Sequence, residues 1–102
     1  MSLEIHYTPK AKKSLQFLYT FIEIKFGKRN AGDFLKKVED TIYLLQEQPY
    51  LFRKSELGNH VRQGLIARNT SFLYEVTNNK IILHFFWDNR QDPFYDNDSS
   101  AI

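Results

Sequence analysis

The sequence has 102 residues, 42% of them hydrophobic and 16% aromatic, which is the composition of one globular domain with a single core. It contains no cysteine, which excludes disulfides and cysteine-based zinc or redox sites and makes a reducing cytoplasm the expected setting. All 14 Lys and Arg residues precede residue 91, whereas Asp92, Asp96 and Asp98 follow it. The basic body favours an acidic protein or nucleic acid as partner, with a merely solvated surface as the alternative.

No stretch approaches the ~18 consecutive apolar residues of a membrane-spanning helix, and the N-terminus lacks a signal-peptide pattern. We therefore expect a soluble intracellular protein with no membrane partner. The chain is predicted to form one domain over residues 1–96, with 97–102 as a flexible acidic tail.

The first 27 residues predict a short strand and an amphipathic helix. Residues 3–7 alternate, with Leu3, Ile5 and Tyr7 on one side. Thr8 is the expected N-cap, Pro9 the first helical residue and Gly27 the end.

This first helix carries more apolar surface than one packing face requires. One stripe comprises Leu15, Leu18, Ile22 and Phe26. A second stripe, made of Phe17, Phe21 and Ile24, points away from the first. The second stripe must either meet another helix or stay exposed, and we favour an exposed partner-binding patch at Phe17 and Phe21.

A second helix is predicted from Asn30, with Asp33 as its capping partner, to Gln48, because Pro49 prevents continuation. It has a single apolar stripe, comprising Ala31, Phe34, Leu35, Val38, Ile42 and Leu45. The short connection between the helices predicts an antiparallel hairpin.

After residue 59 the pattern changes from helical to extended. Residues 60–67 and 68–77 read as strands, and Asn78 and Asn79 suit a two-residue turn because asparagine tolerates positive φ. The next segment, 80–87, is apolar on both faces, which predicts a central strand covered on each side.

Together these elements predict an α+β fold. An N-terminal strand and an α-helical hairpin pack on one face of a mainly antiparallel sheet of about four strands. The opposite face is then expected to carry polar and basic side chains, with four candidates: Arg62, Arg68, His84 and Arg90.

Several polar residues have a structural reading beside a functional one. His84 lies in an apolar strand, where a lone histidine is more often hydrogen-bonded than catalytic, and the histidine spacing predicts no metal or cofactor. Trp87 is expected to pack with its N–H satisfied locally. Arg62 and Arg90 are as well suited to pairing with Glu75, Asp88 or Asp92 as to contacting a target.

The order of several segments resembles the RelE/ParE superfamily, toxins of bacterial type II toxin–antitoxin modules of the plasmid-stabilisation type. The segments are "TPKAKKSL", "QEQP", "HVRQG", "SFLYEV" and "DNRQDP". The resemblance covers nearly the whole chain. It implies a small toxin that a cognate antitoxin wraps and neutralises, often in an operon that represses itself.

The superfamily divides by chemistry. RelE-like members cleave messenger RNA in the ribosome, whereas ParE-like members poison DNA gyrase and carry no nuclease site. RelE-like nucleases usually place an arginine before "LYEV", where this chain has Phe72. The resemblance therefore favours a ParE-like toxin acting on a protein such as gyrase.

The alternative is a RelE-like, ribosome-dependent endoribonuclease. Its candidate catalytic residues are Arg53, Lys54, Arg62, Arg90 and Tyr95. A third reading is a degenerate relative that only binds antitoxin.

The residues expected to bind target or antitoxin are Arg53, Lys54, Arg62, Arg68, Arg90, Phe17 and Phe21. An antitoxin covering the basic positions should be acidic, and a homodimer is another way to cover the phenylalanines.

Overall fold

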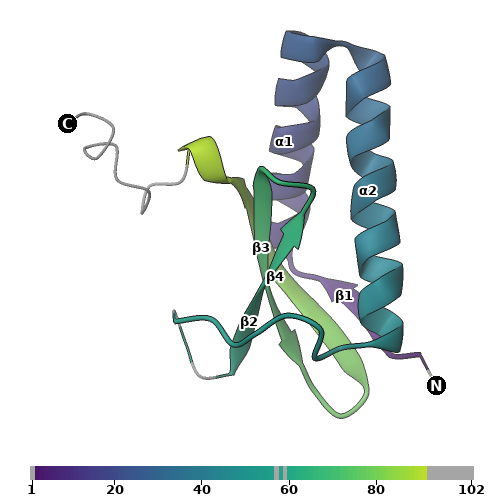
Figure 1. Cartoon of the computed structure of the whole chain (residues 1–102), viewed down its shortest axis with the longest axis vertical. Coiled ribbons are helices and arrows are strands. Elements are labelled where there is room, and N and C mark those ends of the chain that lie inside the picture. The colour runs from purple at the N-terminus through teal and green to yellow at the C-terminus, as the bar shows by residue number, and fades with distance from the viewer. Residues whose placement is uncertain (1, 57, 59, 92–102) are drawn as a thin grey trace.

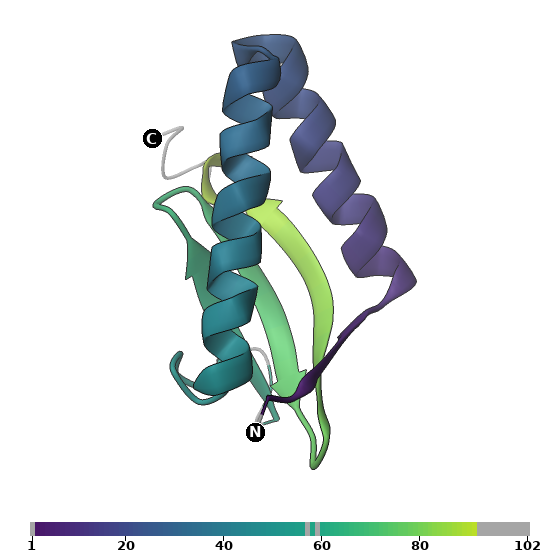
Figure 2. The ribbon, with the colours of Figure 1, turned by 90° about the vertical axis from the view of Figure 1, so that its right-hand side faces the viewer.

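A helical hairpin packs on one face of a four-stranded sheet, as Figures 1 and 2 show from two sides. The structure is a computed structural model that describes residues 2–56, 58 and 60–91. Its elements are β1 (Glu4–Tyr7), α1 (Pro9–Phe26), α2 (Lys28–Glu47), β2 (Val61–Ile66), β3 (Thr70–Val76), β4 (Lys80–Asp88) and the 3₁₀ turn η1 (Asn89–Gln91). The predicted α+β fold is confirmed.

The sheet has the order β1-β4-β3-β2, in which β1 is parallel to β4 and the other neighbours are antiparallel. The apolar segment 80–87 therefore forms a central strand, as predicted. It is not covered on both faces, however, because the helices pack on one face only (Figure 2). Burial alternates along β4, and Ile82, Phe85 and Trp87 on the outer face are only half-buried.

The first helix begins as predicted, but the second does not. The Thr8 side chain accepts the N–H of Ala11 at 3.0 Å and caps α1. Gly27 alone connects the helices, with a φ of 95° that favours glycine. Helix α2 therefore starts at Lys28, and Asn30 is no N-cap; its side chain instead donates to the carbonyl of Phe26 at 2.7 Å.

Beside the second half of β4 lies no strand but the first two turns of α1. Strand β1 pairs with β4 only as far as Leu83, and His84 is the extra residue of a β-bulge. The Thr8 hydroxyl donates to the carbonyl of His84 at 3.0 Å, and the N–H of Phe86 donates to the Ser14 hydroxyl at 2.9 Å. These bonds fix α1 against the end of β4.

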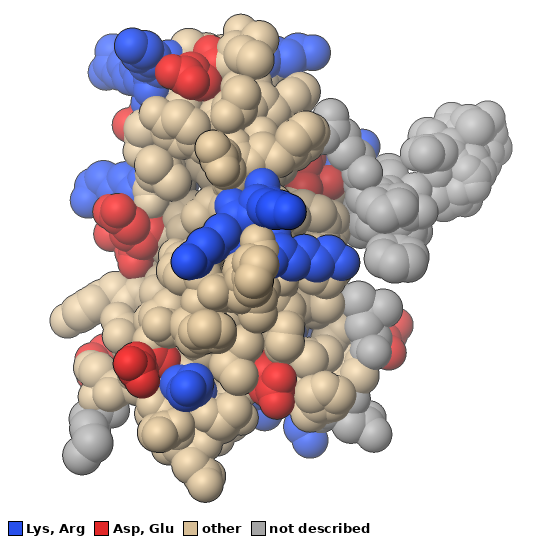
Figure 3. All heavy atoms as spheres, turned by 180° about the vertical axis from the view of Figure 1, so that it is seen from behind, with Lys and Arg blue, Asp and Glu red and all other residues tan. Residues whose placement is uncertain are grey.

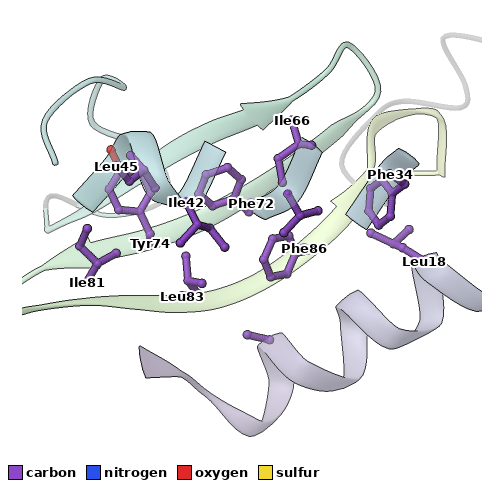
Figure 4. Packing of buried hydrophobic residues seen from close by; sticks show 12 residues of the cluster. Leu18, Phe34, Ile42, Leu45, Ile66, Phe72, Tyr74, Ile81, Leu83 and Phe86 are labelled. Carbon is purple, nitrogen blue, oxygen red and sulfur yellow. The ribbon is translucent and has the colours of Figure 1, made fainter. Parts of the chain in front are cut away.

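The core lies between the helices and the inner sheet face (Figure 4). The predicted stripe of α2 is buried apart from Leu35, which is half-buried. It meets Ile66, Phe72, Tyr74, Ile81, Leu83 and Phe86. Gly64 faces Phe72 so closely that a Cβ there would lie 2.3 Å from the ring, so this position requires glycine.

The β3–β4 turn forms at the predicted place for a different reason. Among the described residues other than glycine, only Ala67, in the β2–β3 turn, has a positive φ. Neither Asn78 nor Asn79 does. The turn is instead closed by Thr77, whose side chain accepts the N–H of Lys80 at 3.2 Å.

Candidate interaction site

Arg62 is half-buried and hydrogen-bonded to the chain itself. It pairs with Tyr74 across β2 and β3, so it lies on the helix-facing side of the sheet and not on the opposite face as predicted. Its Nη1 donates to the carbonyl of Phe52 at 2.7 Å, and its guanidinium lies 4.8 Å from the ring centre of Tyr50. Arg62 therefore anchors the loop between α2 and β2.

The Tyr74 hydroxyl holds the same loop by donating to the carbonyl of Pro49 at 2.9 Å. Burial raises the pKa of Tyr74, against the opposing effects of a backbone hydrogen bond and the charge of Arg62. The phenol consequently stays protonated as a donor at neutral pH.

Arg53, Lys54 and Arg68 are exposed, the first two in this loop and the third in the β2–β3 turn. The backbone of the loop is fixed, because the carbonyl of Arg53 accepts the N–H of Gln63 at 3.3 Å. None of the three side chains forms a salt bridge within the described residues. They remain available to an acidic partner.

Arg90 is clamped to Asp88 at the end of β4. Its Nε and Nη2 donate to the two carboxylate oxygens at 3.0 and 2.8 Å, and its backbone N–H donates at 2.8 Å. Burial alone would raise the pKa of Asp88, which is 6% exposed, but the hydrogen bonds and charge of Arg90 outweigh it and lower the pKa. The pKa of Arg90 is raised by the same hydrogen bonds.

The neighbouring Asn89 completes this polar cluster. Its backbone N–H donates to the carbonyl of Asn69 at 2.6 Å, and its side chain accepts the Ser71 hydroxyl at 2.8 Å. The cluster after β4 is therefore a structural lock between strand ends. Tyr95, the other candidate near this end, lies outside the described residues.

The outer face of the sheet carries His84, as predicted, bonded through Nε2 to Glu75 at 3.1 Å. The Lys10 ammonium lies 4.7 Å from the ring centre of Phe85 beside it. A hollow of about 400 Å³ opens here, bordered also by His60. The described residues contain no group of three or more His, Asp or Glu side chains that could hold a metal ion.

A second hollow, of about 450 Å³, lies between α1 and the end of β4. Its lining includes Lys10, Lys13, Phe17 and Trp87, which we term the α1 surface. Figure 3 shows Lys and Arg side chains gathered at mid-height on the face that α1 presents. The first turn of α1 contains no acidic residue, so nothing there offsets the lysines.

The second apolar stripe of α1 stays largely exposed. Phe17 is 62% and Ile24 80% exposed, whereas Phe21 is half-buried under Lys25, whose ammonium lies 5.8 Å from the ring centre. Phe26, expected in the packing stripe, is exposed as well, because the hairpin end projects beyond the sheet (Figure 1). An exposed apolar side chain beside lysines that form no salt bridge within the described residues suits an acidic, amphipathic protein segment.

Lys10 and Lys13 were not among the predicted site residues. A signal was present, since a helix prefers acids in its first turn and this one has lysines at positions 10, 12 and 13. An acidic partner bound here would offset this unfavourable arrangement. The hollow beside these residues could not be predicted, because it depends on how α1 meets β4.

Comparison with known proteins places this fold among toxin structures. The chromosomal ParDE toxin–antitoxin system from P. aeruginosa is similar with a TM-score of 0.73 and 20% identity, over 85% of this chain and 96% of that one. The E. coli DinJ-YafQ complex gives 0.59 and 10%, over 88% and 96%. The YoeB dimer from Staphylococcus aureus gives 0.58 and 16%, over 83% and 94%. These likenesses show the fold.

The family is shown by the sequence. Residues 5–93 match the family described as ParE toxin of type II toxin-antitoxin system, parDE. No curated protein matches significantly. The chain belongs to the ParE toxin family, and none of its described helices is long and apolar enough to cross a membrane.

Proposed function

We propose that this chain is the toxin of a bacterial toxin–antitoxin module, that it inhibits DNA gyrase by binding it, and that a cognate antitoxin neutralises it by covering the α1 surface. Membership of the ParE family supports the assignment. Action on gyrase would take place in the cytoplasm, and such a module would serve plasmid stabilisation.

One observation carries the choice of binding over catalysis. RNA cleavage needs a base for the 2′-hydroxyl and free cations for the charge on phosphorus. Here the guanidinium of Arg62 is bonded to the Phe52 carbonyl, and that of Arg90 to Asp88. Phe72, at the position of the nuclease arginine, is fully buried against Gly64.

Arg53 and Lys54 are exposed, which favours a second candidate function, RNA cleavage. A RelE-like endoribonuclease would use them to hold messenger RNA in the ribosome, with Tyr95 near the cut. The same cations equally fit acidic residues of an antitoxin, which makes them a weaker argument than the two bound arginines.

The test is a gyrase supercoiling assay with the purified full chain. We expect relaxed plasmid to stay relaxed as the chain is titrated in. A Phe17→Ser variant should inhibit equally but escape neutralisation by the antitoxin, because Phe17 belongs to the α1 surface. Full supercoiling at a large excess of folded chain would contradict the proposal.

A further inference from the structure

Two consecutive residues of β4, His84 and Phe85, lie on the outer face of the sheet. Their neighbours on either side, Leu83 and Phe86, are buried in the core, and the extra residue of the β-bulge accounts for the outward pair. Bulges are frequent beside active sites, where they redirect a side chain. Here the bulge brings His84 to Glu75 of β3, at 3.1 Å.

The hollow of about 400 Å³ on this face, which we term the outer hollow, has an apolar lining from three strands. Val61 of β2 and Leu73 of β3 are buried, and Phe85 is half-buried. The polar residues of the lining are Thr8, Lys10, His60 and His84. An apolar concavity of this volume with a few polar groups is typical of sites for small molecules.

Lys10 is the one lysine or arginine in the lining of the outer hollow, and it forms no salt bridge within the described residues. Its ammonium lies 4.7 Å from the ring centre of Phe85, a contact that leaves its N–H donors to other acceptors. The Thr8 hydroxyl, by contrast, is bonded to the carbonyl of His84 and the N–H of Ala11. Lys10 is therefore the group that can hold an anion in the hollow.

The charges around the outer hollow fit a ligand with a single negative charge. The Glu75 carboxylate is bonded to Nε2 of His84, which lines the hollow, so it does not neutralise Lys10. A second negative charge on a ligand would be repelled by Glu75 and would find no second lysine or arginine in the lining. A monoanion is thus favoured over a dianion such as a phosphate monoester.

We propose that the outer hollow binds a small aromatic monocarboxylate, with its ring against Val61, Leu73 and Phe85 and its carboxylate accepting from Lys10. The ring would remove the apolar lining from water, and the carboxylate would form a charge-assisted hydrogen bond. A rigid ring is favoured over a flexible aliphatic chain because it packs beside Phe85 and loses less conformational entropy. This binding concerns the free chain and depends on neither gyrase nor antitoxin.

The test is a nuclear magnetic resonance titration of the full chain with 4-fluorobenzoate. We expect saturable binding, roughly millimolar for so small a ligand, that shifts the methyl signals of Val61 and Leu73. Leu18 lines the hollow at the α1 surface instead, so its methyl signals should not move. Absence of saturable binding, or shifts at Leu18 in place of Val61 and Leu73, would overturn the inference.

A matched pair of variants tests the role of Lys10. Lys10→Gln should weaken binding about tenfold, because it removes the charge-assisted hydrogen bond. Lys13→Gln, on the same helix and equally exposed, lies in the lining of the hollow at the α1 surface and not of the outer hollow, so binding should change less than about twofold. Equal effects of the two variants would overturn the inference.

Two analogues test the charge of the ligand. Neutral 4-fluorobenzamide lacks the carboxylate, and 4-fluorophenyl phosphate carries a second charge that faces Glu75. Both should bind about tenfold more weakly than 4-fluorobenzoate. Either analogue binding as tightly as 4-fluorobenzoate would overturn the assignment of a monocarboxylate.

Discussion

Two groups of cations, one in and just after the sheet and the other on α1, differ in whether the chain itself binds them. Arg62 and Arg90 are bound to a carbonyl and a carboxylate of the chain itself. Lys13, like its neighbour Lys12, extends from an exposed helical turn with no carboxylate partner among the described residues. A positive residue on a strand is thus not by itself a catalytic residue. The charge left for partners includes the lysines of α1, the cations of the loop before β2 and Arg68.

This difference has an energetic basis. The Asp88 carboxylate is buried, and two of its three donations come from the Arg90 guanidinium. Withdrawing the guanidinium toward a substrate would leave the buried carboxylate with only the backbone N–H of Arg90. A lysine at the start of a helix is opposed by the helix dipole and gains from an acidic partner. The first group stabilises the fold, and the second favours association.

The largest expected effect concerns the α1 surface. Phe17→Ser should weaken antitoxin binding by about 2–4 kcal/mol if the side chain is a central anchor, and leave the melting temperature nearly unchanged because Phe17 is exposed. Calorimetric titration and thermal unfolding measure the two quantities. Tyr43→Ser, an equally exposed aromatic on α2, is the control and should affect neither. A strong fall in the melting temperature of Phe17→Ser would place that side chain in the core.

The next effect concerns the lock after β4. Asp88→Asn should lower the free energy of unfolding by about 1.5–3 kcal/mol, because it removes charge-assisted bonds to Arg90. Asp40→Asn is the control, since Asp40 is exposed and only 3.9 Å from Lys36, and its effect should stay within about 0.5 kcal/mol. Urea unfolding measures both. Equal effects would mean that the lock contributes no more than a surface pair.

The same lock predicts a pH dependence. The folded pKa of Asp88 is lowered, so its contribution is present above the unfolded pKa of about 3.9 and is lost as the pH falls through the folded pKa. The difference in unfolding free energy between wild type and Asp88→Asn should be constant near neutrality and shrink below about pH 4. Urea midpoints from pH 2 to 7 test this. A difference that vanished above pH 5, or persisted unchanged to pH 2, would exclude the assigned ionisation.

The smallest effect separates the two ends of α1. Lys13→Glu should raise the free energy of unfolding by a few tenths of a kcal/mol, because it replaces a positive charge near the helix N-terminus with a negative one, which the helix dipole favours. Lys25→Glu in the last turn should lower it, because Lys25 complements the dipole and lies over Phe21.

The two lysine variants should also differ in binding. Lys13→Glu should slow antitoxin association and reduce its dependence on salt, because Lys13 borders the α1 surface. Lys25→Glu should leave the rate closer to that of the wild type. Stopped-flow mixing at several salt concentrations tests this, and identical rates for both variants would show that the α1 lysines do not steer the antitoxin.

The sequence predicted the elements of the fold well because their patterns are local. The stripe of α2, the Thr8 cap and the alternation in β3 depend on neighbours within a few residues. The start of α2 was missed because Gly27 alone makes the turn and Asn30 caps the preceding helix instead. A capping residue can serve either helix of a hairpin, and local pattern does not distinguish them.

The site was less predictable because it depends on long-range register. Arg62 was assigned to the outer face, but its pairing with Tyr74 turns it toward the helices. A shift of one residue reverses every side chain of a strand, and the β-bulge at His84 introduces such a shift. The hollows beside α1 arise from the packing of elements far apart in sequence.

The most direct test of the account is the cleavage of ribosome-bound messenger RNA by the pure chain, followed by primer extension. Because the guanidinium groups of Arg62 and Arg90 are bonded to other groups of the chain and Phe72 is buried, we expect no cleavage above the rate without added chain, under conditions where the chain is folded. Rapid cleavage that Tyr95→Phe abolishes without unfolding the chain would contradict the account and assign the protein to the nuclease branch.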